Sequence, residues 1–149
     1  MIREYTSRRQ AIVNALVEEL KNINGVSPFI TDLAGAVFPG LRFWDEVENF
    51  PSVYVYAGNE YREYQGGGYK DRYLSISIMC YVNEEDPNLA LEGLLEDVEA
   101  VVESASRLVY KDRQGVDQTT QQISITSIFT DQGVLAPLGV GEIEIVVRY

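Results

Sequence analysis

The sequence predicts an α+β domain of two layers, in which two helices pack on one face of a mostly antiparallel four-stranded sheet. Three observations lead to this prediction: two stretches repeat apolar residues at helical spacing, four stretches alternate apolar with polar residues, and the stretches follow one another in the order α-β-β-α-β-β. The chain has 149 residues, of which 46% are hydrophobic. This size and composition are typical of a single domain, which we expect to span residues 1–149.

The first helix is predicted to begin after Thr6 or Ser7, because either hydroxyl can cap a helix N-terminus. Its apolar stripe consists of Ile12, Val13, Leu16, Val17, Leu20 and Ile23. Asn24 and Gly25 follow the stripe, and a glycine in the left-handed conformation commonly ends a helix. We therefore expect the helix to end at this pair.

A long β-hairpin is predicted next. Two runs flank a triple glycine at 66–68. Residues 52–64 begin by alternating Val53 and Val55 with tyrosines, and residues 69–82 alternate Leu74, Ile76, Ile78, Cys80 and Val82 with polar or aromatic neighbours. The strands near this tip are longer than a small sheet can pair, and they mix tyrosines with charges of both signs. Tyrosine and arginine are favoured in protein contacts. We expect the tip to contact another protein chain, with a solvated hairpin as the alternative; the residues concerned are Arg62, Tyr64, Tyr69 and Arg72.

The second helix is the clearest element of the sequence. Asp86 can cap its N-terminus, and Pro87 suits the first helical position. Its apolar stripe consists of Leu91, Leu94, Leu95, Val98, Val101, Val102 and Ala105. Four glutamates form one ridge on the opposite face: Glu92, Glu96, Glu99 and Glu103. A solvated helix face is the common reason for such a ridge, and a surface that repels phosphate is the alternative.

Two further strands are predicted near the C-terminus. Period-two alternation places Ile123, Ile125, Ser127 and Phe129 on one side of the third strand, and Ile143, Ile145 and Val147 on one side of the fourth. The residues between them are mostly polar or charged. This pattern is typical of an antiparallel sheet with one solvated face.

Two segments carry apolar side chains without a regular period. Residues 26–50 contain four aromatic side chains that we single out (Phe38, Phe43, Trp44 and Phe50), and the connection 131–141 contains Val134, Leu135 and Leu138. Long loops in compact domains are often functional, and exposed apolar patches often mark interfaces. We expect these seven residues to form contacts between subunits, with folding back onto the domain's own core as the alternative.

The charge of the chain disfavours several classes of function. The formal net charge is −11, the opposite of the basic surface by which proteins hold nucleic acids. The apolar runs are too short for a membrane span, and Met1–Tyr5 lack the apolar region of a secretory signal, so the protein is expected to be intracellular as made.

The sequence also offers little for catalysis or metal binding. There is no histidine, and the single cysteine, Cys80, alternates with apolar positions, so we expect it to be buried and inert. The acidic run at 84–86 lacks the spacing of a calcium loop, and the triple glycine joins two strands and does not lead into a helix as a phosphate-binding loop does. We expect no enzyme activity, no cofactor and no metal site.

Several stretches resemble the tail terminator or tail-completion proteins of tailed bacteriophages, of the minor tail protein U type. They are FWDEV at 43–47 with FPSVYV at 50–55, the hairpin tip REYQGGGYKDR at 62–72, EDP at 85–87, and GVLAPLGVGE at 133–142. The likeness spans almost the whole chain. It implies a structural protein of the virion tail, assembled in the host cytoplasm, that forms a ring of six subunits.

The resemblance further implies three partners: other copies of the chain, the tail tube protein whose growth the ring stops, and a head-completion or neck protein. DNA would pass through the ring without specific binding, so part of the excess acid is expected to line the bore. The candidates are the ridge Glu92, Glu96, Glu99 and Glu103, and the pair Glu142 and Glu144. The alternatives are a head-completion or neck connector, and a small acidic adaptor or inhibitor that binds a basic partner.

Overall fold

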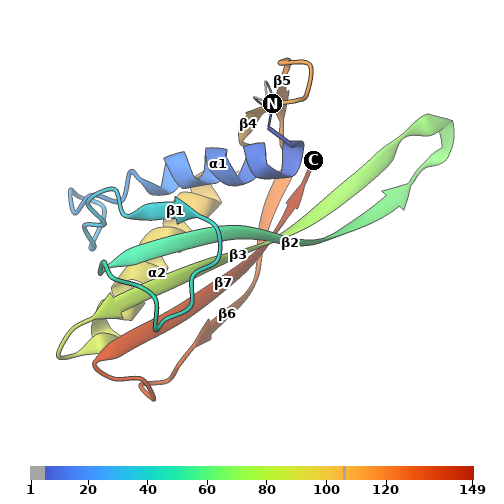
Figure 1. The fold of residues 1–149 in the computed structure, drawn as a ribbon. Helices are drawn as coiled ribbons and strands as arrows, with labels where there is room; N and C mark the ends of the chain where they lie inside the picture. The colour runs from blue at the N-terminus through green and yellow to red at the C-terminus, as the bar shows by residue number, and fades with distance from the viewer. Residues whose placement is uncertain (1–5, 106) are drawn as a thin grey trace.

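A computed structural model describes residues 6–105 and 107–149 of the protein (Figure 1). Residues 1–5, which were used to argue against a secretory signal, lie outside the described residues. The elements in chain order are α1 (Arg8–Leu20), β1 (Val37–Pro39), β2 (Ser52–Tyr64), the short 3₁₀ turn η1 (Gly66–Gly68), β3 (Lys70–Asn83), α2 (Pro87–Ser104), β4 (Val109–Lys111), β5 (Asp117–Thr119), β6 (Gln122–Thr130) and β7 (Leu138–Arg148).

The main sheet has five strands in the order β1-β2-β3-β7-β6, where four were expected. The four predicted strands pair antiparallel with their neighbours, as expected. The additional strand, β1, lies parallel to β2 and pairs Val37 with Val53, so the sheet is mixed. With only three residues, β1 is too short to show the alternation by which strands are predicted.

A second, two-stranded sheet was also not predicted. β4 and β5 form a small antiparallel hairpin that contacts α1 near the C-terminal end of the chain (Figure 1). Most of its residues are exposed and polar, so the segment shows no apolar alternation.

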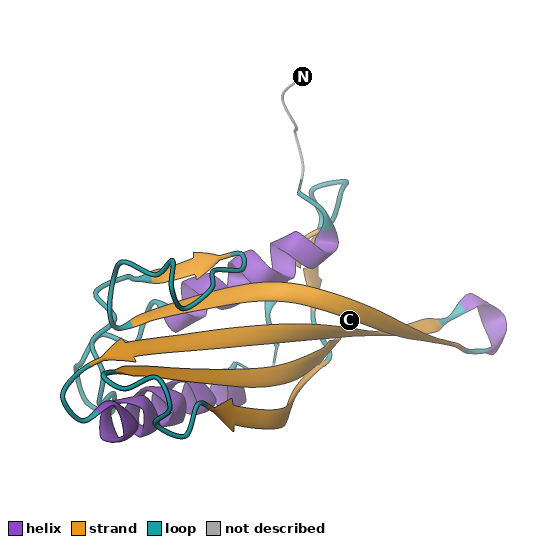
Figure 2. Ribbon diagram, turned by 60° about the horizontal axis from the view of Figure 1, so that its bottom comes forward, coloured by secondary structure: helices purple, strands orange, loops and turns teal. Residues whose placement is uncertain are grey.

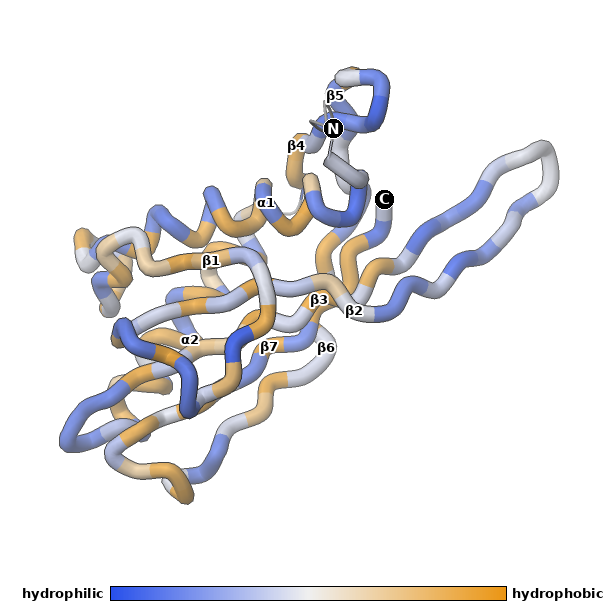
Figure 3. Tube along the Cα trace, in the orientation of Figure 1, coloured by the Kyte–Doolittle hydropathy of each residue, from blue (hydrophilic) through white to orange (hydrophobic). Residues whose placement is uncertain are grey.

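Both helices pack on the same face of the main sheet, as predicted. One buried cluster joins the apolar stripes of α1 and α2 to alternate residues of β2, β3 and β7. Figure 3 shows this alternation as changes of colour along the strands. The packing of α2 on β7 is close, because a Cβ atom at Gly139 would lie 2.7 Å from Val82 Cγ2 and 3.1 Å from the Pro87 carbonyl oxygen. The α+β class with both helices on one face is therefore confirmed. The predicted order α-β-β-α-β-β is wrong, because β1 precedes the hairpin and β4 and β5 follow α2.

The helix starts agree with the sequence, and one helix end differs. The hydroxyl of Ser7 accepts a hydrogen bond from the amide of Gln10, and the carboxylate of Asp86 accepts one from the amide of Leu89. α1 ends at Leu20, one turn before the expected Asn24 and Gly25. Gly25 does adopt a left-handed conformation, with φ of 76°, but it lies in the turn that follows the helix.

The long hairpin is confirmed with bounds close to those predicted. β7 pairs with β3 only as far as Tyr73, so residues 62–72 continue as a two-stranded extension beyond the sheet. Figure 2 shows this extension projecting away from the layer of strands. The register of β2 and β3 shifts between Ala57 and Glu60, shortly before this extension begins.

Candidate assembly surfaces

The segment 40–51 lies over the face of the sheet that the helices leave open. There, Val47 is buried in a second apolar cluster with Tyr54 and Tyr81, and Phe38 and Phe50 pack against this cluster. The hydroxyl of Tyr81 donates a hydrogen bond to the carbonyl oxygen of Arg42, and burial raises the pKa of Tyr81 to about 12. The segment is thus partly folded back onto its own subunit.

The four aromatic residues proposed for a subunit interface therefore divide into two pairs. Phe38 and Phe50 are half-buried within the subunit, and the Phe38 ring lies 5.3 Å from that of Tyr54. Phe43 and Trp44 stay exposed, at 59% and 44%. Only the second pair offers a large apolar surface to a neighbour.

The apolar connection after β6 is a short, ordered turn. The carboxylate of Asp131 accepts hydrogen bonds from the amides of Leu135 and Val140, which fixes the loop against the start of β7. Leu135 is half-buried, and Leu138 is the half-buried first residue of β7. Val134 is 82% exposed, so it is the residue of this loop with most surface to offer.

The hairpin tip is exposed on both strands. Tyr64 and Tyr69 are 72% and 74% exposed. The register pairs Arg62 with Arg72 and Tyr64 with Lys70, and the pairs between them, such as Glu63 with Asp71, point to the opposite face. One face of the extension is therefore basic, and the other carries the acids.

The root of the hairpin is held by a small polar cluster. Arg62 Nε lies 2.6 Å from a carboxylate oxygen of Glu60, the hydroxyl of Tyr149 donates to the same carboxylate, and the Arg72 guanidinium lies 4.7 Å from the centre of the Tyr149 ring. Burial raises the pKa of Glu60, but the hydrogen bonds from Tyr149 and Arg62 outweigh it and leave this pKa below its ordinary value. Burial, followed by the bond to Glu60, raises the pKa of Tyr149 to about 12.

The two acidic sets proposed for a bore lie on opposite sides of the sheet. The ridge of α2 (Glu92, Glu96, Glu99 and Glu103) belongs to the helix layer, whereas Glu142 and Glu144 alternate with the buried Ile143 and Ile145 and so face the open side. A single subunit can therefore turn only one of the two sets toward a central channel.

Asp97 holds two elements of the fold together, and the sequence analysis did not distinguish it from the other acidic residues of its helix. Its side chain is 3% exposed, and its carboxylate accepts hydrogen bonds from the amides of Ile30 (3.0 Å) and Thr31 (2.7 Å). It fastens the loop after α1 to α2. Its place beside the buried Leu94 and Val101, three and four residues away, is the sequence signal that marks it.

A groove of about 570 Å³ runs between α2 and β6. Ile30, Leu89 and Ile128 line it and are exposed, at 67%, 72% and 43%. Glu92, Glu96 and Glu99 of the α2 ridge also line it, whereas Glu103 does not. The groove thus combines an apolar floor with an acidic edge.

Ile128 reaches this groove because of a bulge. The pairing of β6 with β7 shifts between Ile125 and Ser127, so Ile128 lies opposite Ile143 and Phe129 lies opposite Glu142. The expectation that Ile123, Ile125, Ser127 and Phe129 share one side was therefore wrong from Ser127 onward. An extra residue at a bulge reverses the faces of all the residues that follow it.

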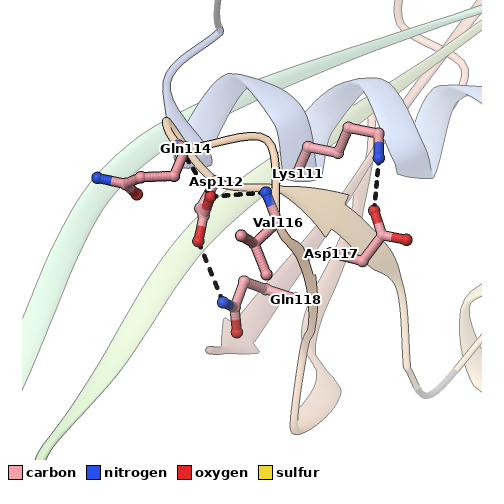
Figure 4. Close-up of polar contacts among 6 residues, drawn as sticks. All are labelled: Lys111, Asp112, Gln114, Val116, Asp117 and Gln118. Atoms are coloured by element: carbon pink, nitrogen blue, oxygen red, sulfur yellow. Dashed lines mark hydrogen bonds and ion pairs between the residues drawn. The ribbon is translucent and has the colours of Figure 1, made fainter.

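A hollow of about 630 Å³ lies between the β4–β5 hairpin and α1. The turn of this hairpin is internally satisfied (Figure 4): the carboxylate of Asp112 accepts hydrogen bonds from the amides of Gln114 and Val116 and from the Gln118 side chain, and Lys111 pairs with Asp117 at 2.8 Å. The bond from the Val116 amide is the main reason why the pKa of Asp112 is lowered. These bonds stabilise a turn and leave no group placed for catalysis there.

Two further groups were considered in the sequence for catalysis or metal binding, namely Cys80 and the acids at 84–86. Cys80 is fully buried, and burial raises the pKa of its thiol to about 12, so it is unreactive. Within residues 6–105 and 107–149, the acids at 84–86 form no cluster that could hold a metal ion. In the same part of the chain, neither helix has the length and apolar character that a membrane crossing requires.

Comparisons with known proteins point in one direction. A family model described as "Bacteriophage Tail Tube Terminator Protein" matches residues 6–149. The tail tube terminator protein p142 of Escherichia phage T5 is 32% identical, with 95% of this chain and 92% of that protein covered. A chain from the virion of a native gene transfer agent particle has the same fold, with a TM-score of 0.60 at 14% identity, covering 93% of this chain and 94% of that chain.

Proposed function

The chain belongs to the bacteriophage tail tube terminator family, and we propose that it ends the tail tube as a closed ring of identical subunits. Members of this family are structural proteins of the phage tail and not enzymes, so the chain is a structural protein of the virion. In the proposed function, the ring binds the last ring of tube protein and stops further growth. Its other side then binds a head-completion or neck protein.

A closed ring needs two unlike patches on each subunit, because each subunit contacts its neighbours head to tail. The observation that carries the proposal is that two separate segments leave apolar side chains exposed: Phe43 and Trp44 in one, and Val134 in the other. Phe38, Phe50, Leu135 and Leu138 are half-buried and offer less surface to a neighbour. The proposed number of six subunits comes from the family resemblance. We also propose that residues 1–149 form one domain.

DNA passes through the bore in this proposal without being held by phosphate contacts. Carboxylates on the wall suit this role, because they repel phosphate and offer no counter-charge to it. Since the α2 ridge and the pair Glu142 and Glu144 lie on opposite sides of the sheet, we propose that one set lines the bore and the other does not.

The ring can be tested with variants at its two patches. We expect Trp44→Ala and Val134→Asp to fold as monomers but to lose assembly, alone or on purified tail tubes, because each removes apolar surface from a subunit contact. Sedimentation would measure the assembled fraction, and electron microscopy would measure whether capped tubes still elongate when tube protein is added. Val116→Asp is the matched control, because Val116 is 54% exposed but lies in the β4–β5 turn. Normal capping by both patch variants would contradict the proposed ring contacts.

A further inference from the structure

The groove between α2 and β6 carries charges that its own subunit does not neutralise. Glu92, Glu96 and Glu99 follow one another at spacings of four and three residues, and like charges at such spacings destabilise a helix. Pro87–Ser104 contains no lysine or arginine, and these glutamates form no ion pair within the described residues. Below them, Ile30, Leu89 and Ile128 remain exposed. A segment with aromatic and basic side chains would cover these apolar residues and neutralise the glutamates.

The tip of the β2–β3 hairpin has the opposite character. Its basic face carries Arg62, Tyr64, Lys70 and Arg72. Arg62 lies directly opposite Arg72, and like charges in that position weaken an isolated hairpin. Lys70 has no ion pair within the part of the chain that the structure describes. The groove is not electrostatically balanced within one subunit. On the hairpin, Arg62 pairs with Glu60 and Arg72 lies over the Tyr149 ring, so Lys70 is the cation left to pair with another copy.

The two surfaces cannot meet within one molecule. The hairpin projects from one end of the sheet, whereas the start of α2 and the end of β6 lie at the other end (Figures 1 and 2). Beyond Tyr73, the last residue of the hairpin that pairs with β7, the extension contains three residue pairs, and at about 3.3 Å per residue it reaches roughly 10 Å past the sheet before the turn begins. Such a reach suits contact with a neighbouring subunit.

We propose that the hairpin tip of one copy docks into the α2–β6 groove of a neighbouring copy. Tyr64 then covers the apolar floor, and Lys70, which lies opposite Tyr64 on the same face, lies against Glu92, Glu96 and Glu99. The contact joins two unlike surfaces, so it repeats around a closed ring and adds to the contacts of the aromatic segment and the 131–137 loop. This inference rests on the proposed ring, and it specifies which surfaces join its subunits.

The docking also decides between the two acidic sets. Glutamates that face a neighbour's hairpin do not face the bore. In this arrangement Glu142 and Glu144 therefore line the bore. Glu103 lies on the same ridge but outside the groove, and it is left to solvent.

A charge exchange tests the contact. We expect Lys70→Glu and Glu96→Lys each to weaken self-association about tenfold or more, because each places like charges opposite one another at the interface. The double variant Lys70→Glu with Glu96→Lys restores opposite charges and recovers assembly. Glu103→Lys is the matched control: it makes the same change on the same ridge outside the groove, and assembly is expected to stay normal. Sedimentation on the protein alone and on purified tail tubes measures assembly, and thermal unfolding checks that each variant is folded.

Cysteine cross-linking gives a second readout that does not depend on charge. Copies carrying Tyr64→Cys are mixed with copies carrying Leu89→Cys, and mild oxidation is expected to join them into covalent pairs of mixed composition. The native thiol does not interfere, because Cys80 is buried. Copies with Glu103→Cys in place of Leu89→Cys are expected to give no pairs.

The outcomes separate this inference from the proposed function. If the wild type assembles but both charge variants assemble equally well, or the mixed cysteine variants form no pairs, the docking is wrong and the ring stands on its other contacts. If the wild type neither self-associates nor caps tubes, the proposed function fails and the docking fails with it.

Discussion

At the scale of single residues, the most informative side chain is Asp97. Because it is charged, its carboxylate would be expected to lie in solvent. It lies within an acidic helix, yet it is buried and accepts hydrogen bonds from the amides of Ile30 and Thr31. A buried amide without an acceptor is costly, so this carboxylate decides where the loop after α1 lies. Because Ile30 lines the α2–β6 groove, Asp97 also shapes a surface that we propose for assembly.

We expect Asp97→Ala to lower the free energy of unfolding by about 1–3 kcal/mol or more, because it leaves two amides without their acceptor. Denaturant unfolding measures this change. Glu103→Ala is the control, since its side chain is exposed on the same helix and surface substitutions usually change stability by less than about 0.5 kcal/mol. Equal stability of the two variants would show that the Asp97 hydrogen bonds contribute nothing.

At the scale of elements, the parts with a long repeated pattern could be predicted from the sequence. The two stripes, the caps at Ser7 and Asp86, and the strands of the hairpin all follow from spacing, because packing on one face fixes the period. β1, β4 and β5 could not be predicted, because three residues are too few to show a period. The bulge in β6 is likewise invisible in the sequence, and it reversed the expected positions of Ile128 and Phe129.

The candidate surfaces were predictable to a similar degree. The aromatic residues of segment 26–50 follow no periodic pattern, which marked the segment as a candidate surface. The sequence could not tell which of these residues would pack on the open face of the sheet. That choice depends on Tyr54 and Tyr81, which belong to two distant parts of the chain. The α2–β6 groove was missed altogether, because it is lined by residues from three separate segments.

The root of the hairpin predicts a dependence on pH. The pKa of Glu60 is lowered in the folded chain, so its contribution to stability is fully present above its ordinary value of 4.5 and is lost as the pH falls through the lowered pKa. We expect amides of residues 61–64 and 70–72 to lose protection from hydrogen exchange at the acid end of this range. Glu60→Gln, measured at the same pH values, is expected to show weaker protection with little pH dependence. Glu63→Gln is the control, and an identical acid loss of protection in Glu60→Gln would contradict the assignment to Glu60.

At the scale of the whole molecule, the net charge of −11 conceals a separation of charge. Nine of the twelve basic residues lie at the end of the molecule that holds the start of α1, the hairpin, the β4–β5 segment and the end of β7 (Figure 1). They are Arg8, Arg9, Arg62, Lys70, Arg72, Arg107, Lys111, Arg113 and Arg148. The same segments carry five acids, namely Glu60, Glu63, Asp71, Asp112 and Asp117, so this end is positive although the chain is strongly acidic. Such a separation of charge favours contacts that join the positive end of one copy to an acidic surface of another, and a head-to-tail ring consists of contacts of this kind.

Removing the hairpin tip tests this arrangement in the complete phage. Replacing residues 63–71 by Asn-Gly joins Arg62 to Arg72 through a two-residue turn of a kind that suits hairpins. Because these residues add nothing to the buried clusters, we expect the isolated protein to keep its thermal stability. In the docking that we propose, the tip is the part that reaches a neighbour, so phages with this change are expected to produce tails of variable and excessive length, measured by electron microscopy. A phage with Glu63→Ser and Asp71→Ser, which alters only the opposite face of an intact hairpin, is expected to keep normal tails. Normal tail lengths with the shortened hairpin would mean that the subunits are joined, and the tube is capped, without it.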